Sequence, residues 1–187
     1  AESVRKAPTA VMLTGAIHDA FVGEVDRRRS DSRLTLLGEA PGDRAPRRGA
    51  AIVFDVAAPE LDDDLMEESF GPTALVVAYT DPDELVTVLA RIGGQLTATV
   101  HAAADETDLI ARLHEILRGR AGRLIFDGYP TGVAVAWAMH HGGPHPATTN
   151  IGHTSVGAAS IRRWLRPISY QNAPADVLPP ELRDDNS

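Results

Sequence analysis

The chain has 187 residues, 43% of them hydrophobic and 24% charged, which is the composition of a globular protein large enough to bury a core as one domain. Its formal net charge of −8 excludes non-specific binding to nucleic acid, whose phosphates require a basic surface. The absence of cysteine excludes disulfides, thiolate metal sites and a cysteine nucleophile within these residues.

Membrane and export signals are missing from the composition. No run approaches the roughly 20 apolar residues of a bilayer-spanning helix. The start, Ala1-Glu2-Ser3, has neither the basic segment nor the apolar run of a signal peptide. We therefore expect a cytoplasmic protein without a membrane partner. The arginine clusters, Arg27–Arg29 and Arg44, Arg47 and Arg48, are interpreted as a solvated helix face and a solvated loop.

Hydrophobic periodicity divides the chain into alternating helices and strands. In chain order, we predict a helix at 13–29, strands at 33–37, 50–56 and 73–79, a helix from Asp81 to Ile92, a strand at 95–102, a helix at 105–118, and a strand at 123–127. An exposed loop at 39–49 and a loop or helical turn at 58–66 connect the first strands. The continuous apolar run at 73–79 is typical of a strand buried on both faces.

Local capping residues support two of these helices. Thr14 can cap the first helix, and Asp81, Pro82 and Glu84 form the capping box that opens the second. The strand–helix–strand succession between residues 73 and 127 implies an α/β fold. We expect an open, mostly parallel twisted sheet with flanking helices.

The last third of the chain changes character. Gly, Pro, Thr, Asn and His dominate residues 128–153, and such a long irregular segment inside a compact domain is usually functional. A final helix is predicted at 158–165, followed by a terminal strand at 166–172 whose proline indicates an edge position. The tail from Pro174 is expected to be ordered only where it contacts a neighbour.

A short motif precedes the apolar strand at 73–79. In Glu67-Glu68-Ser69-Phe70-Gly71-Pro72, two acids and an aromatic residue stand beside a rigid turn. A carboxylate and an aromatic ring held at the end of a strand can position a flat, polar ligand such as a nucleotide.

This motif resembles the Glu-Glu-x-Phe-Gly-Pro motif of the aldehyde dehydrogenase superfamily. The likeness is to a branch of NADP-preferring enzymes that act on α-ketoglutaric semialdehyde or fatty aldehydes, and it extends in consistent order over nearly the whole chain. Further similar segments are Met12–Thr14, Ile92–Val100, Gly128–Val133, His141–Thr148, Thr154–Gly157 and Arg166–Asn172.

The resemblance implies that the chain is the C-terminal part of such an enzyme. In the family a cysteine thiolate attacks the aldehyde, hydride passes to the nicotinamide of NADP or NAD, and a glutamate-activated water releases the carboxylic acid. That cysteine, the glutamate and the cofactor domain would all precede Ala1, so the chain alone would be inactive. Residues 1–165 would be part of the catalytic domain, and 166–187 an oligomerisation strand and tail that supports a homodimer.

Two residues of the motif are cofactor-binding candidates by the same resemblance. Glu68 would accept hydrogen bonds from the ribose hydroxyls beside the nicotinamide, and Phe70 would pack against that ring or its ribose. Glu67 is interpreted as structural. The alternatives are that Glu68 is an ordinary surface carboxylate and that Phe70 belongs to the core.

Tyr129, Pro130, Thr131 and Gly132 would line the tunnel that admits the aldehyde, with α-ketoglutaric semialdehyde as the first substrate expected and aliphatic aldehydes next. The same four residues are also compatible with a plain structural turn. We expect no metal site. His140, His141 and His145 are interrupted by glycines and a proline, and Asp62, Asp63 and Asp64 point in different directions.

A second hypothesis comes from a different class of protein. A stand-alone, non-catalytic α/β module that binds a ligand or a partner would also explain the fold, the acidic surface and the lack of a nucleophile. The choice between NAD and NADP depends on residues outside this chain.

Overall fold

The computed structural model describes residues 1–42 and 45–184 and groups them into two compact units. The first comprises Ala1–Gly93 and Ala102–Arg120, and the second comprises Gly94–His101 and the chain from Ala121 onward. Part of the predicted loop at 39–49, with Arg44, and the last residues of the tail lie outside the described residues. The predicted domain boundary after residue 165 falls within the second unit and stays a prediction.

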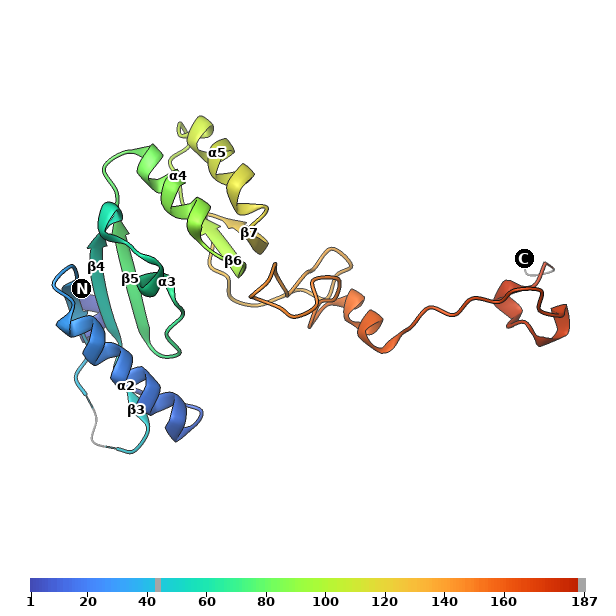
Figure 1. Ribbon diagram of the computed structural model, residues 1–187, viewed down its shortest axis with the longest axis horizontal. Helices are drawn as coiled ribbons and strands as arrows, with labels where there is room; N and C mark the ends of the chain where they lie inside the picture. Colours follow the sequence, from blue (N-terminus) through green and yellow to red (C-terminus); the bar gives the residue numbers. More distant parts are fainter. Residues whose placement is uncertain (43–44, 185–187) are drawn as a thin grey trace. The chain divides into compact units, whose positions relative to one another are not determined.

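The first unit is built on a three-stranded mixed sheet with the order β2-β4-β5, in which Figure 1 shows β4 and β5 side by side. Strand β2 (Thr35–Glu39) is antiparallel to β4 (Ile52–Ala57), which is parallel to β5 (Thr73–Ala78). A separate antiparallel pair joins β1 (Ala10–Val11) to β3 (Arg48–Gly49). The strands predicted at 33–37, 50–56 and 73–79 are therefore confirmed, with small shifts of their ends.

Three of the helices described in this unit begin at a side-chain N-cap, which is Thr14, Asp62 or Asp81. The helices are α1 (Glu2–Arg5), α2 (Gly15–Ser30), the 3₁₀ turn η1 (Ala58–Glu60), α3 (Asp63–Met66), α4 (Pro82–Arg91) and α5 (Thr107–Leu117). The Thr14 hydroxyl accepts a hydrogen bond from the Ile17 N–H at 3.1 Å. The Asp81 carboxylate accepts from the N–H groups of Asp83 and Glu84, as predicted for an N-cap.

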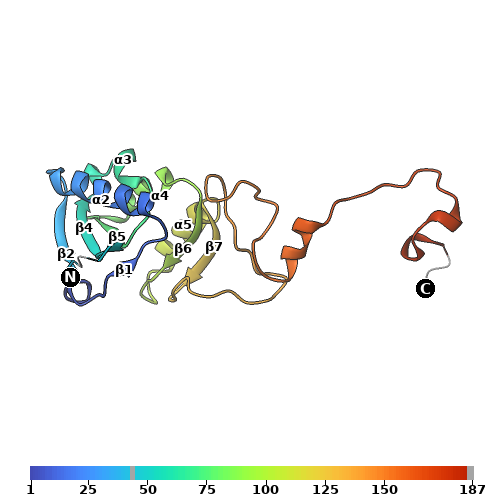
Figure 2. The same cartoon turned by 90° about the horizontal axis from the view of Figure 1, so that it is seen from below.

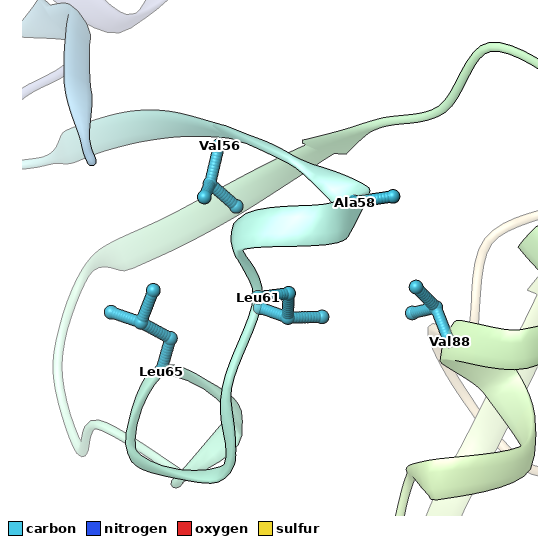
Figure 3. Close-up of a cluster of buried hydrophobic side chains, with 5 residues drawn as sticks. All are labelled: Val56, Ala58, Leu61, Leu65 and Val88. Atoms are coloured by element: carbon cyan, nitrogen blue, oxygen red, sulfur yellow. The ribbon is translucent and has the colours of Figure 1, made fainter. Parts of the chain in front are cut away.

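Both hydrophobic clusters of the first unit lie against one face of its sheet. Alternate residues of β4, Ile52, Phe54 and Val56, are almost fully buried. The first two pack with Met12 and with Phe21 of α2, which crosses the sheet (Figure 2). Val56 packs in the second cluster, shown in Figure 3, whose other members are Ala58, Leu61, Leu65 and Val88.

The opposite face of the sheet is left open. Ala74, Val76 and Ala78 of β5 alternate with partly buried residues and are exposed, Val76 to 44%. The prediction that this strand is buried on both faces is therefore wrong for the described chain. An uninterrupted apolar run indicates that both faces suit burial, but it does not supply the layer that would cover the second face.

The second unit contains one parallel strand pair, β6 (Gln95–Val100) and β7 (Ala121–Phe126), in register from Gln95 opposite Ala121 to Val100 opposite Phe126. Parallel pairing was predicted, but the single open sheet was not found. The strands are divided among three small sheets, and β5 is not hydrogen-bonded to β6. Apolar alternation predicts that a segment forms a strand without specifying its neighbour.

The rest of the second unit is mostly irregular. It contains the 3₁₀ segments η2 (Ala158–Trp164), η3 (Ala175–Val177) and η4 (Pro180–Leu182). The final predicted helix is thus 3₁₀ in type. The predicted strand at 166–172 is wrong for the single chain, because the segment has no strand hydrogen bonds to any described residue. Its pairing with a second subunit stays a prediction. Within the described ranges, no helix is long and apolar enough to cross a bilayer.

Candidate functional site

The Glu67–Pro72 motif is fixed against helix α2 by close packing at its glycine. A Cβ atom at Gly71 would overlap the Phe21 ring, so only glycine allows this contact. The Pro72 carbonyl accepts from the Ile52 N–H at 2.9 Å, and the Gly71 carbonyl accepts from the Thr73 N–H at 2.8 Å. The turn is therefore held by a strand on one side and by a helix on the other.

A buried arginine supports the other end of the motif. Arg28 is only 3% exposed, and its Nη2 donates to the Glu67 carbonyl at 3.5 Å while its Nε donates to Glu24. Hydrogen bonds from Arg27 and then Arg28 lower the pKa of the Glu24 carboxyl. The sequence analysis placed Arg28 on a solvated face, which is wrong for this residue and consistent with the structure for the exposed Arg27 and Arg29.

The two cofactor-binding candidates project from this supported turn. Glu68 is exposed and Phe70 is 66% exposed, so Phe70 is not part of the core of its unit. The hydroxyl of Ser69, which lies between them in the sequence, and the hydroxyl of Thr73 are both buried. Neither has a hydrogen-bond partner among the described residues. The exposed carboxylate and the exposed ring fit a ligand that carries a diol and a flat ring. The roles of Glu68 and Phe70 stay predictions.

A second group of side chains stands at the carboxyl ends of β6 and β7. His101 follows β6, and its ring centroid lies 5.7 Å from that of Tyr129 with the planes tilted by 54°. Asp127 follows β7 with a φ of 48°, donates its N–H to the Val100 carbonyl at 2.9 Å, and has its Oδ1 3.9 Å from His101 Nδ1. Ligands of parallel α/β sheets bind at this edge.

The predicted tunnel segment continues from this edge. Tyr129 is 80% exposed, Pro130 and Thr131 are exposed, and Gly132 has a φ of 75°, a conformation that favours glycine. The structure thus brings these residues together on one open loop, and their role in a tunnel stays a prediction. His101 and Asp127 were not predicted as site residues, although each lies at or near the carboxyl end of a predicted strand, and that position could have identified them.

The histidines flank a loop that packs tightly on the second unit. Cβ atoms built on Gly122 or Gly143 would overlap the backbone of Gly142 or Gln95, so glycine is required at this crossing. His141 Nδ1 lies 3.0 Å from the Ser155 hydroxyl, and the His141 N–H donates to Thr154 at 2.8 Å. These contacts account for a structural role of His141.

The acidic run at residues 62–64 makes structural contacts with its own helix and with two arginines. Asp62 caps α3 by accepting from the Leu65 N–H and also pairs with Arg33, while Asp63 pairs with Arg91. Across residues 1–42 and 45–184, no three His, Cys, Asp or Glu side chains gather closely enough to hold a metal ion.

Comparison with known proteins relates the whole chain to one group of enzymes. Alpha-ketoglutaric semialdehyde dehydrogenase 2 of Azospirillum brasilense is 40% identical over 188 residues, which is 100% of this chain and 36% of that protein. Alpha-ketoglutaric semialdehyde dehydrogenase of Acinetobacter baylyi is 48% identical over 124 residues, 65% of this chain and 23% of that protein. The chain therefore spans about a third or less of these relatives. No protein-family model matches it.

Solved structures of dehydrogenases match the fold of the chain. The delta-pyrroline-5-carboxylate dehydrogenase of Mycobacterium tuberculosis matches with a TM-score of 0.59 and 23% identity, over 74% of this chain and 26% of that one. The succinic semialdehyde dehydrogenase of Streptococcus pyogenes, solved in complex with NADP+, matches with a TM-score of 0.55 and 14% identity, over 71% and 28%. With the sequence identities, these matches show that the chain belongs to the aldehyde dehydrogenase superfamily, as a homologue of part of these enzymes.

Proposed function

We propose that the chain is the C-terminal catalytic-domain part of an NAD(P)-dependent aldehyde dehydrogenase that oxidises a semialdehyde to a carboxylic acid. The observation that carries this proposal is the 40% identity to an alpha-ketoglutaric semialdehyde dehydrogenase over all of the chain. In the intact protein, aldehyde, water and oxidised nicotinamide would give acid, reduced nicotinamide and a proton. The thiol, the general base and most cofactor contacts would come from residues before Ala1.

The part of the reaction assigned to this chain is cofactor positioning. The bound nicotinamide nucleotide would supply the hydride acceptor. Glu68 would accept from two vicinal ribose hydroxyls, and Phe70 would present its exposed ring to the ribose or nicotinamide. Packing of Gly71 on Phe21 and the hydrogen bond from Arg28 to the Glu67 carbonyl would hold both side chains in place.

A pair of neighbouring glutamates tests this assignment in the intact protein. Glu68→Gln should raise the KM for NAD(P) about 10-fold or more, because a hydrogen bond to a charged acceptor contributes roughly 1.5–3 kcal/mol. Glu67→Gln is the matched control, since Glu67 is also exposed and its hydrogen bonds in the described structure come from its backbone groups. The KM of the Glu67→Gln variant for NAD(P) should stay within about two-fold of the wild-type value. Equal effects of the two changes would remove Glu68 from the cofactor site.

The intact protein should also distinguish the two hypotheses of function. Production of reduced nicotinamide from α-ketoglutaric semialdehyde, faster than from aliphatic aldehydes of similar length, would support the dehydrogenase and its substrate. The tunnel role of Tyr129–Gly132 belongs to this proposal. If the intact protein oxidised no aldehyde with either NAD or NADP, a non-catalytic binding module would become the better explanation.

A homodimer is the proposed assembly of the intact enzyme. Ile168 and Tyr170 are exposed, to 61% and 43%, on a segment without strand partners in the described chain. Exposed apolar residues on an unpaired segment favour pairing with a second subunit. Ile168→Asp should lower the mass measured by light scattering to that of a monomer, whereas Val22→Asp, at an exposed apolar position of α2, should leave the dimer intact. A wild-type monomer at micromolar concentration would contradict the proposal.

A further inference from the structure

One side chain joins the exposed 129–132 loop to the sheet of the second unit. Arg123 lies on β7, opposite Thr97 of β6. Its Nη1 donates to the Gly132 carbonyl at 2.9 Å, and its Nη2 donates to the Pro130 carbonyl at 3.0 Å. Nη1 also lies 3.9 Å from Met139 Sδ, further along the same irregular segment. A single guanidinium therefore bridges the strand to two points of the loop.

The chemistry of these contacts requires an arginine. The guanidinium is planar and presents several N–H donors in a rigid fork, so it can satisfy two carbonyls at once. A lysine ammonium is a single point donor on a flexible stem and cannot reproduce both bonds in the same geometry. The Arg123 Nε is buried and has no hydrogen-bond partner among the described residues, so this side chain is held by its two terminal nitrogens.

The loop itself offers little packing to replace this bridge. Every residue from Tyr129 to Ala138 is exposed. Gly132, whose carbonyl is one of the two acceptors, has a φ of 75° and no atom within 4 Å of the position of a Cβ. Without the arginine, the loop would lose two charge-assisted hydrogen bonds and gain no alternative apolar contact.

We propose that Arg123 is a positioning residue that fixes the 129–132 loop and thereby sets the affinity of the enzyme for its aldehyde. This inference rests on the proposed function, in which that loop lines the substrate tunnel. Arg123 acts through the loop backbone and not by touching the substrate. Its loss should therefore affect aldehyde binding more than cofactor binding.

The chain provides a matched control for the substitution. Arg120 also donates to two backbone carbonyls, those of Ile92 and Ala90, but these lie at the end of helix α4 in the first unit. Arg123→Met and Arg120→Met each remove one guanidinium and two carbonyl hydrogen bonds while keeping an unbranched apolar stem. Any general effect of losing such a bridge should appear in both variants, and an effect on the loop only in the first.

Two readouts on the intact protein test the inference. Steady-state kinetics should give Arg123→Met an aldehyde KM raised about 10-fold or more with the KM for NAD(P) within two-fold of wild type, and Arg123→Lys a value in between. Arg120→Met should leave both KM values within about two-fold. Proteolytic cleavage within the exposed residues 129–138 should be about 10-fold faster in Arg123→Met and should stay at the wild-type rate in Arg120→Met.

The two readouts separate failure of the inference from failure of the proposed function. Wild-type KM values and a wild-type cleavage rate in Arg123→Met would overturn the inference even if the enzyme oxidises aldehydes. Wild-type protein that oxidises no aldehyde would overturn the proposed function, and the cleavage rate would then still decide whether Arg123 holds the loop. If Arg123→Met does not fold, Arg123→Lys is compared with Arg120→Lys in the same two measurements.

Discussion

The ring of Phe21 on helix α2 occupies the space that a side chain at Gly71 would need. This contact joins the first unit's main helix to the turn that carries Glu68 and Phe70. Because Phe21 is only 6% exposed and belongs to a buried cluster, the ring has little freedom to move aside. The position of the turn is therefore coupled to the packing of the core.

Adding a methyl group at this contact should be destabilising. Gly71→Ala is expected to lower the free energy of unfolding by about 1–3 kcal/mol, the cost of overpacking a filled site. Gly23→Ala is the control, because a Cβ at Gly23 on α2 meets nothing within 4 Å. It should raise the stability by about 0.5–1 kcal/mol through helix propensity. Urea unfolding of both variants measures the difference, and equal shifts would contradict the contact.

Removing the buried guanidinium of Arg28 should be more costly than removing its exposed neighbour. Arg28→Met deletes hydrogen bonds to Glu24 and to the Glu67 carbonyl in a side chain that is 4% exposed, for a loss of about 2 kcal/mol. Arg27→Met removes the ion pair with Glu24, in which the arginine side chain is 44% exposed. It should lower the free energy of unfolding by less than about 1 kcal/mol. Thermal unfolding compares the two. A larger loss for Arg27→Met would mean that Arg28 does not support the motif.

The pH dependence of stability should report the Asp31–Arg33 pair. Hydrogen bonds from the Arg33 side chain and backbone lower the pKa of Asp31 from 3.8 to about 2. A carboxyl with a lowered pKa in the folded chain stabilises it above the unfolded pKa, and this contribution is lost as the pH falls toward the folded pKa. Asp31→Asn should therefore be less stable than wild type above about pH 4, and the difference should shrink toward pH 2.

Urea midpoints measured between pH 7 and pH 2 check this expectation. The control is Asp26→Asn, a change of an exposed carboxylate on helix α2. Its midpoint should differ from that of wild type by a small and nearly constant amount. A difference for Asp31→Asn that stayed constant down to pH 2 would show that the charge of Asp31 does not contribute through its ion pair.

Local signals in the sequence were enough to predict most elements. Thr14 and Asp81 bond to N–H groups within three residues, so their capping roles depend on nothing distant. The parallel pairing of β6 with β7 was likewise predicted, because a helix separates the two strands. The parallel pairing of β4 with β5 was not predicted, because the sequence indicated only a loop or helical turn between them.

Long-range relationships were not predictable in the same way. Arg28 is buried because Glu67, 39 residues further along, lies beside it, and nothing within the Arg27–Arg29 run indicates which member turns inward. The pairing of His101 with Tyr129 also depends on the β6–β7 register. The sequence motif identified Glu68 and Phe70 as candidates, whereas their supports, Phe21 and Arg28, became visible only in the fold.

The open face of β5 gives a last test, which compares the 187-residue chain with the intact protein. Val76 is 44% exposed on a strand whose neighbour β4 is parallel to it, and parallel strands are ordinarily covered on both faces. If the intact enzyme covers this face, Val76→Thr should cost about 1–2 kcal/mol there, because a buried hydroxyl would lack a partner. In the 187-residue chain the same change should stay within about 0.5 kcal/mol.

Val56→Thr is the matched control. Because Val56 is 1% exposed in the first unit, this substitution should lower the free energy of unfolding of both proteins. Chemical unfolding of the four variants against their parents gives the comparison. An equally small effect of Val76→Thr in both proteins would mean that the face stays open in the intact protein. That result would favour a free binding surface over a domain interior, and with it the non-catalytic module over the dehydrogenase fragment.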